Sequence, residues 1–181
     1  FISDHNSHTI RLLDYHSVGI DVSTLAGAGY TPGYRDGPAS NSLLYKPNGV
    51  DTYLNSPGSW LDLYVADGGN RVIRKVSMLT LEVTTVAGKS DSRGFADGAG
   101  TSAARFQMPF GLMVDQAFPA QVYITDFGNR TNFTLHPITN LSQHIPSGLL
   151  RAYDIATGDV VRIAGSSFAT GLVDGKRHAV R

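Results

Sequence analysis

The chain of 181 residues contains no cysteine, a single tryptophan and few charged side chains, which make up 17% of the sequence. The lack of cysteine excludes disulfides and thiolate metal sites in this chain, but it does not assign a compartment. Neither sign of charge is in excess, because 15 Lys and Arg balance 15 Asp and Glu. Nucleic-acid-binding proteins usually carry a basic excess, since phosphate contacts supply much of their affinity. The totals therefore argue against a nucleic-acid partner.

Long apolar runs are also missing, and none approaches the roughly 18–20 residues that cross a membrane as a helix. We expect no membrane span in this segment. The chain opens with Phe1-Ile2-Ser3-Asp4, without an initiator Met and without the basic-then-apolar pattern of a signal peptide. This opening leads us to expect that the sequence starts inside a longer polypeptide.

Glycine and aromatic residues are plentiful, with 20 Gly, 8 Tyr and 8 Phe. This composition is typical of a β-rich protein with frequent tight turns. Three aspartates, Asp4, Asp67 and Asp126, each follow a short strand-like run and lie about sixty residues apart. This regular spacing divides the sequence into three imperfect copies of one motif. An internal repeat of this kind determines the architecture.

Other landmarks recur in the same order in each copy. A short apolar run closes with Ala-Gly at Ala26-Gly27, Ala87-Gly88 and Ala164-Gly165. An Asp-Gly pair then follows at Asp36-Gly37, Asp97-Gly98 and Asp174-Gly175. After the first two pairs comes a strand start that contains proline, at Pro47 and Pro109.

Each copy offers four short strands joined by Gly, Asp and Asn turns, which is the make-up of one propeller blade. For the last copy we expect strands near 109–115, 120–125, 149–155 and 159–165. The middle blade sits near 47–88, and the first blade lacks its opening strand. The predicted units are 1–46, 47–108 and 109–181, the last with an insertion at 131–148.

The stretch from Val65 to Lys75 resembles the NHL repeat, and the joint from Phe95 to Gly111 is similar to joints in plant and protist members of that family. The resemblance implies an all-β fold, an NHL-type β-propeller that commonly has six blades. It does not imply one activity, since the family includes lyases, RNA binders and extracellular adhesion modules. Three blades do not close a ring. Further blades outside this segment, or blades of neighbouring chains, are expected to complete it, and the first option is simpler.

The recurring polar residues are interpreted as structural. The aspartates that lead the copies, together with Asn70, are expected to pin turns, because short polar side chains bond the backbone nearby. The Asp-Gly aspartates, Asp36, Asp97 and Asp174, are placed at turns between blades. We further expect Arg74 and Arg105 to lock neighbouring blades by pairing with an aspartate such as Asp97.

The insertion at 131–148 is rich in Pro and polar residues, which predicts a loop leaving the blade. It carries the N-glycosylation sequons at Asn132 and Asn140, and a third sequon lies at its edge at Asn129. N-linked glycans require a surface loop in a secretory compartment. The sequence therefore predicts an extracellular or cell-surface location.

No catalytic or cofactor motif is present: the chain has no Gly-x-Ser-x-Gly elbow, phosphate loop or dinucleotide fingerprint. His5 and His8 are three residues apart, but no third metal ligand has a compelling spacing. We expect no catalytic residue, cofactor or metal site.

These features predict a non-enzymatic structural or protein-interaction module of an extracellular glycoprotein, such as a subunit of a surface fibre or appendage. Its expected partners are other blades of the same or neighbouring chains, and proteins or glycans at the propeller face. Two alternatives stay open. One is a lyase or hydrolase with a site in the central channel, and the other is an RNA-binding NHL propeller with a basic face.

Overall fold

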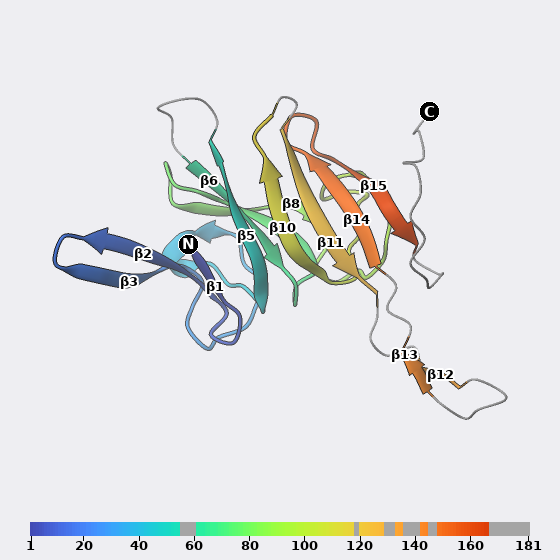
Figure 1. Cartoon of the computed structure of the whole chain (residues 1–181), viewed down its shortest axis with the longest axis horizontal. Coiled ribbons are helices and arrows are strands. Elements are labelled where there is room, and N and C mark those ends of the chain that lie inside the picture. The colour runs from blue at the N-terminus through green and yellow to red at the C-terminus, as the bar shows by residue number, and fades with distance from the viewer. Residues whose placement is uncertain (55–60, 118–119, 129–132, 136–141, 145–147, 167–181) are drawn as a thin grey trace.

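The computed structural model describes residues 1–54, 61–117, 120–128, 133–135, 142–144 and 148–166 (Figure 1). Within these ranges the chain is almost entirely β, and its one helical element is the short 3-10 helix η1 (Ala39–Asn41). None of the described residues forms a helix long and apolar enough to cross a bilayer.

Three antiparallel sheets follow one another along the chain. The first sheet contains β1 (Ile2–Asp4), β2 (Thr9–His16) and β3 (Gly19–Ala26). The second sheet has the order β4-β8-β7-β6-β5, with bounds β4 (Gly37–Pro38), β5 (Pro47–Leu54), β6 (Leu61–Asp67), β7 (Val72–Ser77) and β8 (Glu82–Gly88). The third sheet has the order β10-β11-β14-β15-β9, with bounds β9 (Gly98–Ala99), β10 (Pro109–Asp115), β11 (Gln121–Phe127), β14 (Gly148–Asp154) and β15 (Asp159–Ser166).

The four strands expected for the last copy are found within about two residues of their predicted bounds. The sequence missed β4 and β9, two-residue strands that begin at the glycine of an Asp-Gly pair and extend the outer edge of the following sheet. The predicted unit boundaries at 46/47 and 108/109 stay predictions.

The insertion is not a plain loop. It contains a two-stranded antiparallel ribbon of β12 (Phe133–Leu135) and β13 (Ser142–His144), which projects away from the third sheet (Figure 1). This pairing is not predictable from the sequence, because the segment has no alternating apolar pattern.

Two apolar layers hold the three sheets face to face. Alternation along β6 places Leu63 and Val65 in the layer against the first sheet, and Tyr64 and Ala66 in the layer against the third. Both faces of β6 are covered by neighbouring sheets, which accounts for its nearly continuous run of hydrophobic residues. The stack of antiparallel sheets with short strands confirms the predicted β-propeller-like fold.

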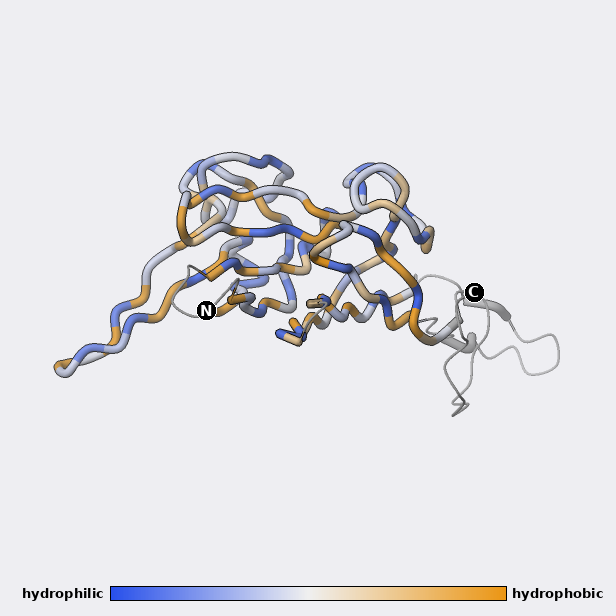
Figure 2. Tube along the Cα trace, turned by 90° about the horizontal axis from the view of Figure 1, so that it is seen from above, coloured by the Kyte–Doolittle hydropathy of each residue, from blue (hydrophilic) through white to orange (hydrophobic). Residues whose placement is uncertain are grey.

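The sheets approach most closely at their inner strands. The Asp51 carboxylate on β5 accepts a hydrogen bond from the Val114 amide on β10 at 2.8 Å. A Cβ at Gly49 would lie 2.5 Å from the Leu112 nitrogen, so only glycine permits this approach. At the opposite end the β2–β3 hairpin projects from the stack, and hydrophilic and hydrophobic residues alternate along it (Figure 2).

Candidate functional site

The centre of the second sheet holds a buried arginine whose two terminal nitrogens each have two acceptors, while its Nε has no partner within the described part of the chain. The Arg74 guanidinium has no exposed surface and donates to Asp67 Oδ2 at 2.9 Å and to Asp36 Oδ1 at 2.7 Å. It also donates to the backbone carbonyls of Leu43 at 3.1 Å and Arg35 at 2.8 Å. Arg74 thus joins its own sheet to the segment that precedes that sheet in the chain.

The third sheet repeats this arrangement around Arg151, which is equally buried. Its guanidinium donates to Asp97 Oδ1 at 2.8 Å and to Asp126 Oδ2 at 3.4 Å. The remaining hydrogen bonds go to the carbonyls of Arg105, at 2.5 Å, and of Ala96. We call each such set of one arginine and two aspartates an arginine lock.

A backbone irregularity positions the arginine in every sheet. The register between the third and fourth strands of a blade shifts between Ile73 and Arg74, between Leu150 and Arg151, and at Ile10/Arg11 in the first sheet. A β-bulge turns the local side chains and increases the strand twist. The extra residue on the partner strand lies in the run that closes with Ala-Gly, which explains why that run recurs.

The glycine of each Ala-Gly pair has a positive φ, of 91° at Gly27, 90° at Gly88 and 92° at Gly165. A Cβ at Gly88 would stand 2.5 Å from the Arg71 carbonyl oxygen. Both observations require glycine directly after the bulge.

The predicted turn residues divide into two groups. Asp4 accepts a hydrogen bond from the Ser7 amide at 3.2 Å, as a turn residue does. Asp67 and Asp126 instead lie fully buried in the locks, and Asn70 donates to Asp67 Oδ2 at 2.8 Å. Their spacing in the sequence does not indicate that these carboxylates are buried.

The predicted pairing of Arg105 with Asp97 is wrong. The Asp97 carboxylate pairs with Arg151, whereas the Arg105 side chain donates to Ser92 Oγ at 3.2 Å and to the Ala104 carbonyl at 2.7 Å. Arg105 contributes its backbone carbonyl to the lock, not its charge. Arg74 does pair with aspartates, but with Asp67 and Asp36.

The predicted glycosylation sites Asn129, Asn132 and Asn140 lie outside the described residues, as does Asp174. Of the histidines considered for a metal, His5 Nδ1 contacts Asn48 Oδ1 at 2.9 Å. The Lys46 amide donates to His8 Nδ1 at 3.2 Å. The described residues contain no group of three or more His, Cys, Asp or Glu side chains that could hold a metal ion.

Burial raises the pKa of Asp67 and of Asp126 to about 6, although the arginines and the amide donors favour the charged form. Carboxylates with raised pKa values occur in active sites, but structural ion-pair networks perturb them as well. Here both carboxylates are enclosed by lock partners, so they are unavailable to a ligand.

The accessible charge gathers elsewhere, in a pocket of about 250 Å³ between the turns of the second and third sheets. Lys46, Arg71 and Arg93 contribute three cations, and the Lys46 ammonium lies 5.8 Å from the centre of the Tyr45 ring. No carboxylate is among the described residues that line it. We call this the cationic pocket.

Among the described residues, no ion pair includes Lys46, Arg71 or Arg93. Partial burial and, after it, the neighbouring Arg93 guanidinium lower the pKa of Arg71 from its ordinary value. The cations come from three separate segments of the chain, which is why no sequence motif predicted this pocket. Its chemistry suits a bound carboxylate, sulfate or phosphate group.

Comparison with known proteins gives likenesses of fold only. No family model and no curated protein matches the chain. The structure is similar to an auxiliary nutrient binding protein from Bacteroides ovatus, with 21% identity and a TM-score of 0.60 over 90% of this chain and 33% of that chain. An auxiliary nutrient binding protein from Bacteroides thetaiotaomicron matches at 26% identity and a TM-score of 0.60, over 67% of this chain and 31% of that one.

A protein named "Putative phosphatase", also from Bacteroides thetaiotaomicron, matches at 24% identity and a TM-score of 0.60 over 67% of this chain and 28% of its own. The chain therefore spans between 28% and 33% of the length of these three solved structures.

Proposed function

We propose that the chain is a non-enzymatic binding module whose cationic pocket receives an acidic group of a partner protein or glycan. The observation that supports this function is that the buried charges are paired, whereas the accessible cations gather in one pocket. The buried ions are paired within the arginine locks, while Lys46, Arg71 and Arg93 share one accessible pocket that has no carboxylate among its described lining residues. The names of two solved neighbours also refer to binding.

Binding of the full chain to immobilised polyglutamate and to a sulfated polysaccharide tests this role, at low and at physiological salt. We expect the triple variant Lys46→Gln, Arg71→Gln, Arg93→Gln to bind at least about tenfold more weakly, because each lost charged contact removes part of the attraction. Arg162→Gln, which removes an exposed arginine outside the pocket, is the matched control. Equal binding by the triple variant and the control would contradict the proposal.

The same assay separates the RNA-binding alternative. A protein that binds the phosphate backbone of RNA loses affinity steeply as the salt concentration rises, and the slope grows with the number of phosphates contacted. Single-stranded RNA bound more tightly than polyglutamate, with loss in the triple variant, would favour that alternative.

The phosphatase name of one neighbour makes hydrolysis the specific enzymatic alternative. We expect no turnover of a chromogenic phosphate monoester by the full chain, with or without added divalent cations. Turnover that survives purification and is lost in the triple variant would establish an enzyme and remove the non-enzymatic role.

We further propose that the module belongs to an extracellular or cell-surface glycoprotein, such as a fibre or appendage subunit. The three sequons at residues 129–142 support this location. Intact-glycopeptide mass spectrometry of the native protein tests it, with glycan expected on Asn132 or Asn140. Unmodified asparagine at all three sequons would remove the main support for the secretory route.

A further inference from the structure

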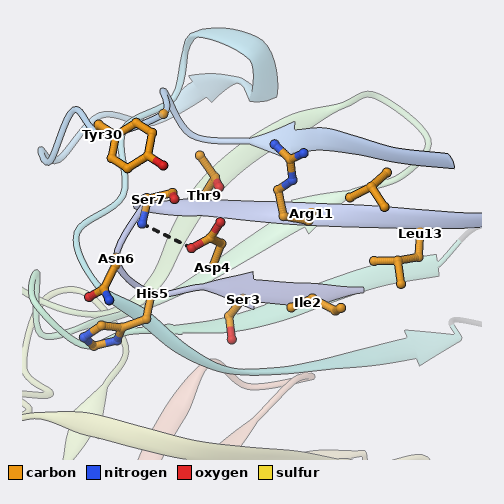
Figure 3. Close-up of a pocket in the computed structure, with 12 residues that line it drawn as sticks. Ile2, Ser3, Asp4, His5, Asn6, Ser7, Thr9, Arg11, Leu13 and Tyr30 are labelled. Atoms are coloured by element: carbon orange, nitrogen blue, oxygen red, sulfur yellow. Dashed lines mark hydrogen bonds between the residues drawn. The ribbon is translucent and has the colours of Figure 1, made fainter.

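The cationic pocket holds more positive charge than one carboxylate or sulfate group would balance. Its three cations, Lys46, Arg71 and Arg93, have no carboxylate beside them among the described lining residues. By contrast, a pocket of about 650 Å³ beside β1 and β2 has Asp4 as well as Arg11 in its wall (Figure 3). An anion with two charges gains about twice the Coulomb attraction of an anion with one. The charge of the cationic pocket therefore favours a dianion.

Two of the three cations stand on a backbone that suits glycine. The φ angle is 52° at Lys46 and 62° at Arg71, in the left-handed region that long side chains rarely adopt. His8 follows Asp4 by the same four positions as Arg71 follows Asp67, and its φ is 60°. The turn itself thus sets this conformation, and glycine would adopt it at a lower cost. Strain of this kind gathers at binding sites, which indicates that the two charges serve a ligand.

The guanidinium of Arg71 is held in place from the protein side. Its Nη1 donates to the Ser90 carbonyl at 3.4 Å, and its backbone amide donates to the Gly68 carbonyl at 3.3 Å. Arg93 is near enough for its charge to disfavour the charged form of Arg71. An anion between the two guanidinium groups relieves this repulsion, and phosphate offers several oxygens to their planar forks.

An aromatic wall lies next to these charges. The Tyr45 ring is 37% exposed and meets the His8 ring edge-on, with 5.4 Å between the ring centres. A Cβ at Gly69 would lie 2.5 Å from Tyr45 Cδ1, so the tyrosine ring packs directly against this glycine. The pocket volume of about 250 Å³ is below the roughly 300–1,000 Å³ of sites for drug-sized ligands. A fixed aromatic face in so small a pocket suits one terminal sugar ring that carries an acidic group.

We propose that the cationic pocket binds a sugar phosphate monoester, with the phosphate dianion among Lys46, Arg71 and Arg93 and the sugar ring on Tyr45. This inference rests on the proposed binding function and names its ligand class. A phosphate monoester carries nearly two negative charges at pH 7, with a second pKa of about 6. A carboxylate, a sulfate ester and each phosphodiester of RNA carry one. The chain binds and releases this ligand without cleaving a bond.

Isothermal titration calorimetry of the full chain tests the charge preference, with glucose 6-phosphate and glucose 6-sulfate as matched probes. At about pH 7.5 we expect the phosphate to bind at least about tenfold more tightly than the sulfate. At about pH 5 the ratio of the two affinities should approach one, because the phosphate then carries about one charge, as the sulfate does at both pH values.

The sulfate probe also controls for protein groups that titrate in the same window. Asp67 accepts a hydrogen bond from the Tyr45 amide at 2.8 Å, and Asp126 accepts one from the Gln107 amide at 3.0 Å. Both carboxylates have a pKa of about 6, and His8 contacts the tyrosine ring. Protonation of these groups acts on both probes, whereas the affinity ratio follows the charge of the ligand. The three cations of the pocket keep their charge throughout.

Two variants and one further probe test the geometry. Arg93→Gln should weaken phosphate binding at least about tenfold and lower the phosphate-to-sulfate ratio, since one cation is lost. The exposed Arg162→Gln should change neither. Tyr45→Leu should weaken glucose 6-phosphate more than inorganic phosphate, because only the sugar contacts the ring. A phosphoserine peptide is expected to bind at least about tenfold more weakly than glucose 6-phosphate.

Equal affinity for the phosphate and the sulfate at about pH 7.5, with both lost in the triple variant, would overturn the preference for a dianion and leave the proposed function standing. Tighter binding of the phosphoserine peptide would overturn the sugar assignment. Polyglutamate binding without any binding of glucose 6-phosphate would overturn this inference alone. The absence of binding to every acidic probe would contradict the proposed function as well.

Discussion

Arg74 and Arg151 carry full charges with no exposed surface, which a protein interior tolerates only when the charge is paired and hydrogen-bonded. Each lock meets this condition with one carboxylate from its own sheet and one from the preceding Asp-Gly pair. Removing one member of a buried ion pair leaves the others uncompensated. The recurrence of aspartate at these positions therefore has a cause in electrostatics as well as in turn geometry.

Replacing Arg74 by Ala should strongly destabilise the fold, because Asp67 would stay buried without its cation. We expect the free energy of unfolding to fall by about 3–5 kcal/mol, the usual effect of breaking a buried pair. Denaturant-induced unfolding measures it, with the exposed Arg162→Gln as control, where the expected change is within about 0.5 kcal/mol. A similar loss of unfolding free energy in both variants would show that the Arg74 lock does not stabilise the fold.

The raised pKa of Asp67 makes part of the stability depend on pH. The native state binds more protons than the unfolded chain between the ordinary aspartate pKa of 3.8 and the native value of about 6. The stability that protonation contributes is therefore fully present below the lower value, and it is lost as the pH rises through about 6. We expect the free energy of unfolding of the wild type, minus that of Asp67→Asn, to be higher at acidic than at neutral pH. Thermal melts across this window measure it, and a difference that grows toward neutral pH would contradict the assignment.

The locks could be predicted from the sequence only where the chain keeps its spacing. Arg74 follows Asp67 by 7 residues, but the insertion separates Arg151 from Asp126 by 25. Arg151 therefore has no local signal, and the sequence points instead to Arg105, which stands next to a recurring landmark. Which arginine is buried depends on strand pairing across the insertion, and a linear motif does not contain that information.

Among the strands, the bulge and the glycine after it act as one device. The bulge turns the arginine into the lock, and the left-handed glycine lets the chain return to the outer edge. A strand without this irregularity would place its arginine in the regular alternation of the sheet.

Gly88→Ala should destabilise the chain, because alanine is strained at a φ of 90° and its Cβ would stand 2.5 Å from the Arg71 carbonyl oxygen. We expect a loss on the order of 1–3 kcal/mol, as for other strained backbone positions. Gly19→Ala is the control, since nothing lies within 4 Å of its Cβ position. Equal melting temperatures for the two variants would show that the glycine is not required.

Element by element, apolar runs bounded by turn residues gave the main strands correctly, including Pro109–Asp115 and Gly148–Asp154. The pattern failed for β4 and β9, since two residues are too few to show periodicity. It also failed for β12 and β13, whose pairing is confined to a small ribbon outside the sheets.

In the whole molecule, each sheet is stabilised mainly by its neighbours, as in other repeat proteins. The second sheet has a neighbour on both faces, and Leu63 to Ala66 are almost completely inaccessible to water. The first sheet is covered on one face only, and its hairpin carries exposed residues such as Tyr15, at 72%, and Val18, at 95%.

Amide hydrogen exchange should follow this gradient. We expect the amides of Tyr15 to Val22 to exchange fastest among the strands and those of β6 and β7 to be best protected, because local opening costs least where few contacts are lost. Mass spectrometry of exchanged peptides measures the order. Uniform protection across the three sheets would indicate that the stack unfolds as a single cooperative unit.

At this scale the sequence predicted the number of repeats and the class of fold, since both follow from landmarks that recur in order. It did not predict the cationic pocket, whose cations Lys46, Arg71 and Arg93 are brought together only by the packing of two sheets. Composition reports a net charge of zero and conceals this local excess.

Each complete sheet occupies one uninterrupted stretch of chain that opens with an Asp-Gly pair, residues 36–88 for the second and 97–166 for the third. A gene duplication that copies such a stretch adds a blade together with both aspartates of its arginine. A duplication that starts at the next strand, at Pro47, and ends before Asp97 would leave the copied arginine without a preceding Asp-Gly aspartate. Growth of the propeller by recombination is therefore expected to keep breakpoints between the Ala-Gly and Asp-Gly landmarks, where the chain joins one sheet to the next.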